Sequence, residues 1–273
     1  MKRLVIALIA SLGCASAPAA TVSVPDTAPV ASVRGPLLSG PAQWADSAAR
    51  QIERATIKGD LEGLRSAKVL LDRALVAYPN DALLLHYQGY ELYREAGILD
   101  GRGPAAQAEV PLVAATARAK LQQSLAVQPL PETHALLAMV MGRMIGIDPS
   151  FGPTLGPLIP EEIRAAVTSG PNNPRVWLLR GIQSYYTPIQ YGGGLLEAET
   201  QLNKAIELFA TDNAVPPAPS WGKAEAFVWL GKVFQKQSRI EEARAAYKDA
   251  LAIQPDYPWV TYSLLPSLPK TTK

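Results

Sequence analysis

Hydrophobic and polar positions follow a helical period most clearly over residues 224–255. Apolar positions recur on one face of a first segment, a short polar turn follows, and apolar positions recur on a second segment. The pattern predicts two closely packed helices, because Gly231 and Ala243 are small where the backbones must approach. Pro255 lacks a backbone N–H and is expected to end the second helix. The residues expected to hold this pair together are Phe227, Leu230, Gly231, Phe234, Ala243, Tyr247, Ala250 and Pro255.

The same succession of helix, turn and helix recurs upstream, with larger departures from the pattern. Gly89 and Gly181 occupy first-helix positions that correspond to Gly231. Two long insertions separate paired helices, one rich in Pro and Gly over residues 147–160 and one rich in Tyr and Gly over residues 185–194. The further helical pairs are expected over residues 45–79, 82–129, 131–171 and 174–210.

The order of residues in the last pair resembles a known repeat. Large, Leu, Gly and aromatic residues in one helix, followed by small, large and small residues before a proline, are similar to one tetratricopeptide (TPR) unit of roughly 34 residues. The resemblance extends with decreasing fidelity over residues 45–265. It implies an all-α fold, a right-handed α-solenoid of about five TPR-like helical hairpins with inserted loops. A single hairpin leaves an apolar face bare, so neighbouring hairpins must stack on it.

The N-terminal residues have the layout of a bacterial-type secretory signal peptide. Lys2 and Arg3 precede an apolar run over residues 4–10, and small residues follow over 11–20. That apolar run is too short to span a bilayer. Cleavage near residues 17–20 is the first interpretation. The alternative is lipid attachment at Cys14, the single cysteine, although the large and small residues before it stand in the reverse of the usual order.

These features divide the chain into four parts. We expect a signal peptide over residues 1–20, a flexible Pro/Ala/Ser/Val-rich tether over 21–43, a TPR-like α-solenoid over 44–265 and a disordered tail over 266–273. The protein is expected to be exported, either periplasmic or secreted, or anchored to the envelope by a lipid on Cys14. No other apolar run is long enough to cross a membrane, so the mature chain is expected to have no transmembrane span.

The charge balance argues against nucleic acid as a partner. Lys and Arg total 26, and Asp and Glu total 24. Loss of Lys2 and Arg3 with the leader leaves 24 of each, and no basic block occurs in the rest of the chain. Proteins that bind nucleic acid depend on a clustered positive charge, which is missing from this sequence.

No combination of residues predicts an enzyme. His86 and His134 have no second ligand at metal-binding spacing, so both are expected in the core or in a groove. The glycine run over residues 192–194 could present N–H groups to an anion. It lacks a preceding strand and a following Lys-Ser or Lys-Thr, so a structural role in the inserted loop is favoured. We therefore expect no metal, no cofactor and no catalytic residue.

The inner face of the first helices is the candidate binding surface, because the first helix of each hairpin lines the concave side of such stacks. Aromatic and Arg residues are typical interface anchors. The groove is expected to be aromatic in its middle and basic toward its C-terminal end. Its candidate residues are His86, Tyr90, Tyr93, Arg94, Arg143, Ile182, Tyr185, Tyr186, Lys232, Gln235 and Lys236. The alternative is that several of the tyrosines only seal the inserted loops.

Three functions remain from these observations, and an enzyme with an unusual site is the least favoured of them. The first is a non-catalytic envelope or periplasmic TPR interaction module that binds a protein or peptide partner in its concave groove. The alternative is a small-molecule-binding accessory protein of an uptake system, a role taken by some exported TPR-like proteins. An enclosed pocket between hairpins would favour the alternative, whereas an open groove would favour the first. TPR proteins that bind a chaperone's C-terminal carboxylate need a lysine where this chain has Val228, so that activity is not supported.

Overall fold

The computed structural model describes residues 40–269, and their ordered elements are all helical. The first hairpin pairs α1 (Pro41–Lys58) with α2 (Leu61–Ala77). Gly59 makes the turn between them in the left-handed conformation, with φ 64°, which glycine adopts without steric cost. The carboxylate of Asp60 then caps α2 by accepting a hydrogen bond from the backbone N–H of Gly63 at 3.0 Å.

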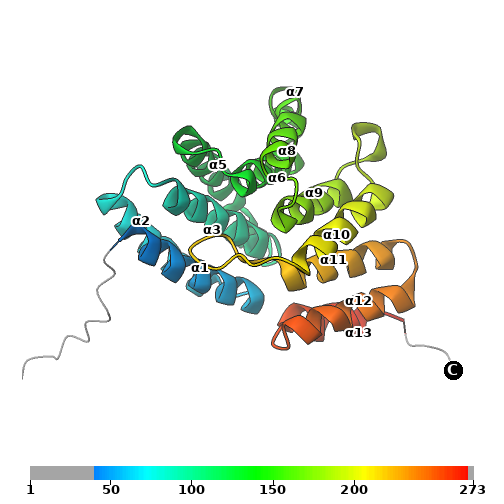
Figure 1. Cartoon of the computed structure of the whole chain (residues 1–273). Helices are drawn as coiled ribbons and strands as arrows, with labels where there is room; N and C mark the ends of the chain where they lie inside the picture. The colour runs from blue at the N-terminus through cyan, green and yellow to red at the C-terminus, as the bar shows by residue number, and fades with distance from the viewer. Residues whose placement is uncertain (1–39, 270–273) are drawn as a thin grey trace, which may run out of the picture. The chain divides into compact units, whose positions relative to one another are not determined.

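Four more hairpins follow along the chain (Figure 1). Their first and second helices are α3 (Ala82–Asp100) with α5 (Val110–Val127), α6 (Pro131–Ile147) with α8 (Leu158–Ser169), α9 (Pro174–Tyr186) with α10 (Leu195–Phe209), and α11 (Lys223–Lys236) with α12 (Ile240–Ile253). The inserted segments hold the short helices α4 (Pro104–Gln107), η1 (Pro149–Phe151), α7 (Gly152–Leu155) and η2 (Ile189–Tyr191). After α12 come η3 (Val260–Leu264) and α13 (Leu265–Ser267).

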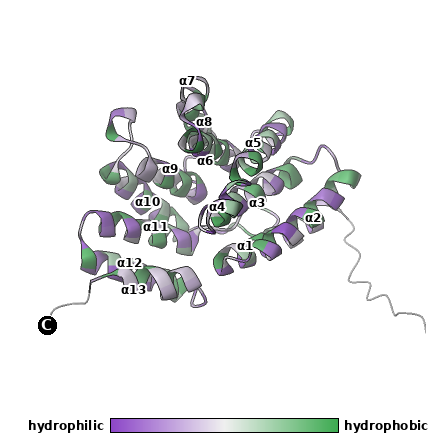
Figure 2. Ribbon diagram, turned by 180° about the vertical axis from the view of Figure 1, so that it is seen from behind, coloured by the Kyte–Doolittle hydropathy of each residue, from purple (hydrophilic) through white to green (hydrophobic). Residues whose placement is uncertain are grey.

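The helices stack in two rows. Each second helix contacts the first helix of the next hairpin, as α2 contacts α3 and α10 contacts α11. The first helices also contact one another in succession, from α1 through α3, α6 and α9 to α11. This arrangement is the predicted all-α solenoid. Hydrophilic and hydrophobic residues alternate along α1 and α2, as expected of helices that bury one face (Figure 2).

Close packing within the hairpins depends on glycine. A methyl group at Gly231 would overlap the ring of Tyr247, which comes from the facing helix α12. At Gly181 the added carbon would lie 2.7 Å from Leu202, again a residue of the second helix. Leu202 and Tyr247 are fully buried. Only a residue without a side chain lets the paired backbones approach this closely.

The segment between α10 and α11 crosses the row of first helices (Figure 1). The hydroxyl of Tyr87 in α3 donates a hydrogen bond to the carbonyl of Pro217 at 2.7 Å. The ring of Trp221 stacks on Tyr90 with 4.6 Å between centroids and 15° between planes. The last hairpin is therefore tied directly to the second one, a contact that the local sequence pattern did not predict.

The ordered part differs at both ends from the predicted boundaries. Helix α1 begins at Pro41, inside the predicted tether, because proline suits the first turn of a helix. Past the predicted end at 265, Leu268 is buried in the core, and Arg244 donates a hydrogen bond to the carbonyl of Pro269 at 2.6 Å. Residues 266–269 therefore belong to the packed body. The predicted signal peptide, Cys14 and nearly all of the tether lie outside the described residues.

Within residues 40–269, none of the helices combines the length and the apolar character needed to cross a membrane.

Candidate functional site

The candidate groove residues on α3 lie inside the molecule. His86 is fully buried, and its Nδ1 lies 2.8 Å from the hydroxyl oxygen of Thr133 in α6. Burial disfavours the charged imidazolium and lowers the pKa of His86 to about 3, so the ring is neutral at ordinary pH. His86 therefore packs the second hairpin against the third and is not accessible to a partner in this structure.

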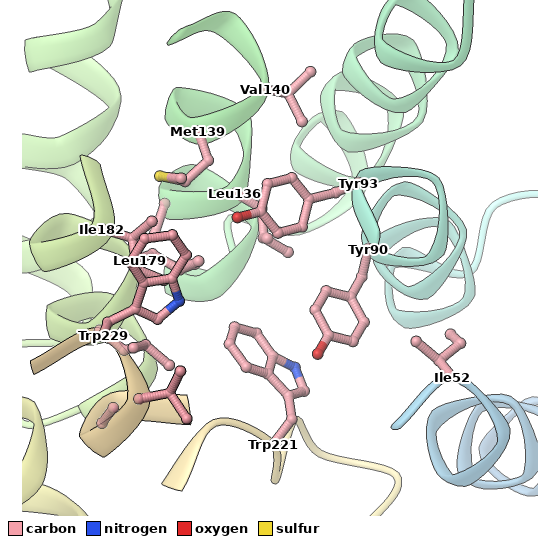
Figure 3. Packing of buried hydrophobic residues seen from close by; sticks show 14 of the residues in the cluster. Ile52, Tyr90, Tyr93, Leu136, Met139, Val140, Leu179, Ile182, Trp221 and Trp229 are labelled. Carbon is pink, nitrogen blue, oxygen red and sulfur yellow. The ribbon is translucent and has the colours of Figure 1, made fainter. Parts of the chain in front are cut away.

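Tyr90 and Arg94 contact the chain's own last hairpin. The guanidinium of Arg94 donates to Glu225 at 2.8 Å and to the hydroxyl of Tyr90 at 3.0 Å. Burial opposes ionisation of Glu225, but the charge and hydrogen bonds of Arg94 outweigh it and hold the pKa of Glu225 below its usual value. Figure 3 shows Tyr90 pointing toward Trp221, and Tyr93 pointing toward α6. This part of the expected groove is filled by the segment that precedes α11.

An aromatic group remains accessible farther along the row. The ammonium nitrogen of Lys232 in α11 lies 3.8 Å from the ring centroid of Trp229, 5.3 Å from that of Tyr185 and 5.0 Å from that of Trp259. Tyr186 packs edge-on against Trp229, with 5.7 Å between centroids. Tyr186 is 64% exposed and Trp259 is 38% exposed. We call these five residues, Tyr185, Tyr186, Trp229, Lys232 and Trp259, the Lys232 cluster.

The pKa of Lys232 is unusually low for a lysine near the surface. Burial against the rings, with a further contribution from Lys236, lowers the pKa of Lys232 to about 8. Among residues 40–269, no carboxylate lies within ion-pair distance of its ammonium group. The rings supply cation–π attraction but no counter-charge. The cluster is thus a partly exposed aromatic surface with a cation that has no ion-pair contact, and the charge of Glu225 acts on Lys232 only from a greater distance.

The other candidate residues occupy varied positions. Ile182 is buried in the core, whereas Lys236 is exposed. The side chain of Arg143 forms an ion pair with Asp100, and its guanidinium carbon lies 5.8 Å from the ring centroid of Tyr93. Gln235 accepts a hydrogen bond from the hydroxyl of Tyr247 at 2.9 Å, so it helps to join α11 to α12.

The glycine run of the inserted loop has a structural role. Gly192 and Gly194 have φ of 81° and 106°, and Gly193 has no room for a side chain beside Thr187. The three backbone N–H groups donate to the carbonyls of Ile189, Pro188 and Ser184. Because these donors are used within the loop, they do not form an anion site in this structure.

Metal-binding groups are not assembled in the described part of the chain. No set of three or more His, Cys, Asp or Glu side chains there could hold a metal ion. His134 instead pairs with Glu162 of α8, with 2.6 Å between Nδ1 and the carboxylate.

Two adjoining cavities lie between α1 and the residues that follow α12. The outer one, of about 490 Å³, is lined by Arg50, Glu53, Arg54, Ile57, Lys58, Gln254 and Asp256. The inner one, of about 100 Å³, shares Glu53, Ile57 and Gln254 with it and reaches Tyr90, Arg94 and Trp221. The sequence did not predict this site, because it combines residues from the first and last hairpins.

Sequence reasoning also missed Trp229, a buried residue at 8% exposure, as a member of the Lys232 cluster. It stands three positions before Lys232, a spacing that places both on one helix face, so this neighbour could have been found. Trp259 comes from beyond α12, and no local spacing indicates that it meets Lys232.

Comparisons with known proteins support the fold alone. No protein-family model matches the chain, and no curated protein matches its sequence. Among solved structures, the HusA haemophore from Porphyromonas gingivalis is similar with a TM-score of 0.58 and 20% identity, covering 73% of this chain and 96% of that one. TTC0263, a thermophilic TPR protein of Thermus thermophilus, gives a TM-score of 0.49 and 20% identity, with coverage of 76% and 92%.

Proposed function

We propose that this chain is a non-catalytic TPR-like binding module that holds a protein or peptide partner against the Lys232 cluster. The observation that carries the proposal is the Lys232 ammonium, which has no ion-pair contact, within a partly exposed set of tyrosines and tryptophans. Tyrosine and tryptophan are the residues that most often anchor protein interfaces. A partner that offers a carboxylate to Lys232 and an apolar side chain to Tyr186 and Trp259 would complete the cluster.

The proposed place of action rests on the sequence alone. The predicted signal peptide favours a partner in the periplasm or at the envelope, with lipid attachment at Cys14 as the alternative. Compared with the groove first expected, the proposed surface is smaller, because His86 is buried against α6 and the segment before α11 covers Tyr90 and Arg94.

Site-specific photo-crosslinking tests this function. A photoreactive residue in place of Tyr186 is expected to capture one envelope protein, whereas the same residue in place of Leu112 is not. Leu112 is 74% exposed but lies on α5, a second helix. Binding of the captured protein should then weaken about tenfold or more in Lys232→Gln, since a hydrogen bond to a charged group contributes about 1.5–3 kcal/mol. Equal capture at both positions would refute the proposed surface.

A small-molecule-binding accessory role in an uptake system is the second candidate. The observation in its favour is the pair of partly open cavities between the first and last hairpins, since small-molecule sites are concave clefts or cavities. The haemophore function of HusA belongs to that structural neighbour, and 20% identity extends only the fold to this chain.

A further inference from the structure

The two cavities form one site that joins the ends of the solenoid. Glu53 and Ile57 of α1 line both cavities, as does Gln254 after α12. The aromatic wall of the inner cavity is formed by Tyr90, Trp221 and Tyr257, which are all buried. The outer cavity has the volume of an ordinary small-molecule site, and the inner one extends it into the protein.

Three buried hydrogen-bonding groups, on residues that line the inner cavity, have no partner in the described structure. They are the indole Nε1–H of Trp221, the Nε–H of Arg94 and the hydroxyl of Thr56. Trp221 is only 4% exposed, and the Arg94 side chain 11%. A buried donor without an acceptor costs about 1–3 kcal/mol, so such groups normally have a protein, water or ligand partner.

Glu53 adds an acceptor beside these donors. Its carboxylate forms no hydrogen bond or ion pair with another residue in the range 40–269. Burial raises the pKa of Glu53, while Arg94 and Arg175 act in the opposite direction. The negative charge of Glu225, which also lines the inner cavity, adds to the rise. A ligand ammonium group at Glu53 would supply the missing counter-charge inside the cavity.

The outer lip is basic. Arg54 on α1 has no ion-pair partner in the described part of the chain. Lys58 is only loosely paired with Asp256, at 3.9 Å, and both side chains are exposed, so the pair holds the ammonium weakly. A second acidic group on the ligand would meet these two cations.

We propose that this site binds a free acidic amino acid. Its α-carboxylate accepts hydrogen bonds from Trp221 Nε1–H and Arg94 Nε–H, its ammonium group lies against Glu53, and its side-chain carboxylate faces Arg54 and Lys58. The proposal rests on the small-molecule role given above as the second candidate. It involves none of the residues of the Lys232 cluster, so the two sites can be tested separately.

Isothermal titration calorimetry with the whole chain and L-glutamate tests the assignment. Saturable binding is expected. Glutarate, which lacks the ammonium group, and 4-aminobutyrate, which lacks the α-carboxylate, should each bind about tenfold or more weakly, because each loses a charge-assisted hydrogen bond. No saturable binding of L-glutamate, the result if the cavities hold only water, would overturn the proposal. Glutarate binding as tightly as L-glutamate would overturn it as well.

Two variants locate the binding. Trp221→Phe keeps an aromatic ring beside Tyr90 but removes the indole donor, and Glu53→Gln removes the carboxylate charge. Each should weaken L-glutamate binding about tenfold, as expected for loss of a hydrogen bond to a charged group. Trp177→Phe removes an indole donor on α9 outside both sites, so it is the control and should bind L-glutamate as the wild type does. Thermal melts confirm that the variants are folded, and unchanged affinity in both folded variants would refute the site. A failure of photo-crosslinking at position 186 would count against the partner-binding proposal and would leave the proposed amino-acid site unaffected.

Discussion

At the level of single residues, the main feature of this molecule is its buried ionisable side chains. Glu91 of α3 is fully buried, and neither of its carboxylate oxygens has a hydrogen-bond partner in the described structure. Burial, with the nearby charge of Glu95, raises the pKa of Glu91 to about 9, although Lys68 acts in the opposite direction. Glu91 is therefore protonated in the folded protein at neutral pH, whereas the ordinary pKa of its carboxyl group is 4.5.

The contribution of Glu91 to the free energy of unfolding should fall as the pH rises. The folded state keeps a proton that the unfolded chain releases, so this contribution is fully present below pH 4.5 and is lost as pH rises toward 9. Glu91→Gln cannot titrate, so thermal melts at pH 5 to 9 should show a smaller decline than in the wild type. Comparing the two chains isolates Glu91, because the other groups titrate in both. Glu62→Gln, at an 84% exposed side chain, should keep the wild-type slope. Parallel wild-type and Glu91→Gln curves would contradict this account.

The residues of the Lys232 cluster show what one sequence can and cannot reveal. Tyr185, Tyr186 and Lys232 are visible as candidates because helical spacing places them on the free face of their own helices. The sequence leaves His86 either in the core or in a groove, and only its contact with Thr133, 47 positions away, places it in the core. Helical spacing identifies a face, but only tertiary packing determines whether that face is covered.

At the scale of elements, the hairpins follow from local chemistry. Gly59 and Asp60 turn and cap the chain, and Pro255 follows the end of α12, so these boundaries can be predicted from sequence. The inserted helices α4, α7 and η2 are three or four residues long, too short to produce a periodic signal. Their positions could not have been predicted.

Replacement of Gly231 tests the packing within the last hairpin. Gly231→Ala should destabilise the protein, because overpacking costs about 1–3 kcal/mol, whereas alanine improves helix propensity by only about 1 kcal/mol. The neighbouring ring of Tyr247 is held by its hydrogen bond to Gln235 and cannot move freely. Urea unfolding measures the change.

Gly146 provides the matched control for this substitution. It lies in α6, and nothing approaches within 4 Å of the position that its Cβ would occupy. Gly146→Ala should therefore stabilise the protein by about 0.5–1 kcal/mol. Stabilisation by both substitutions would contradict the close approach of α11 and α12.

At the scale of the whole described body, a largely buried ion pair joins distant parts of the solenoid. Arg94 and Glu225 are 131 positions apart and mostly buried. Local patterns predict the succession of hairpins, but they contain no information about this pairing or about the crossing of α3 by the segment before α11. Residues 214–219 could be identified only as a proline-rich loop, which explains why the filled part of the groove was not foreseen.

Replacing Arg94 should lower the free energy of unfolding, because it breaks this ion pair. Arg94→Met leaves Glu225 buried without its partner, and breaking such a pair costs about 3–5 kcal/mol. The exposed pair of Arg50 and Asp46 on α1 is the control, and Arg50→Met should cost about 0–1 kcal/mol. Thermal and urea unfolding compare the two. Equal, small losses would mean that the link between the second and fifth hairpins contributes little to stability.

Hydroxyl-radical footprinting measures whether the inner row of first helices is divided into a filled part and an accessible part. Tyr186 and Trp259 should be oxidised faster than Tyr90 and Trp221 in the isolated protein, because only the first two are substantially exposed. The photo-crosslinked partner should also protect Tyr186 and Trp259. Oxidation of Tyr90 and Trp221 as fast as that of Tyr186, or a bound partner that leaves Tyr186 and Trp259 unprotected, would contradict this account.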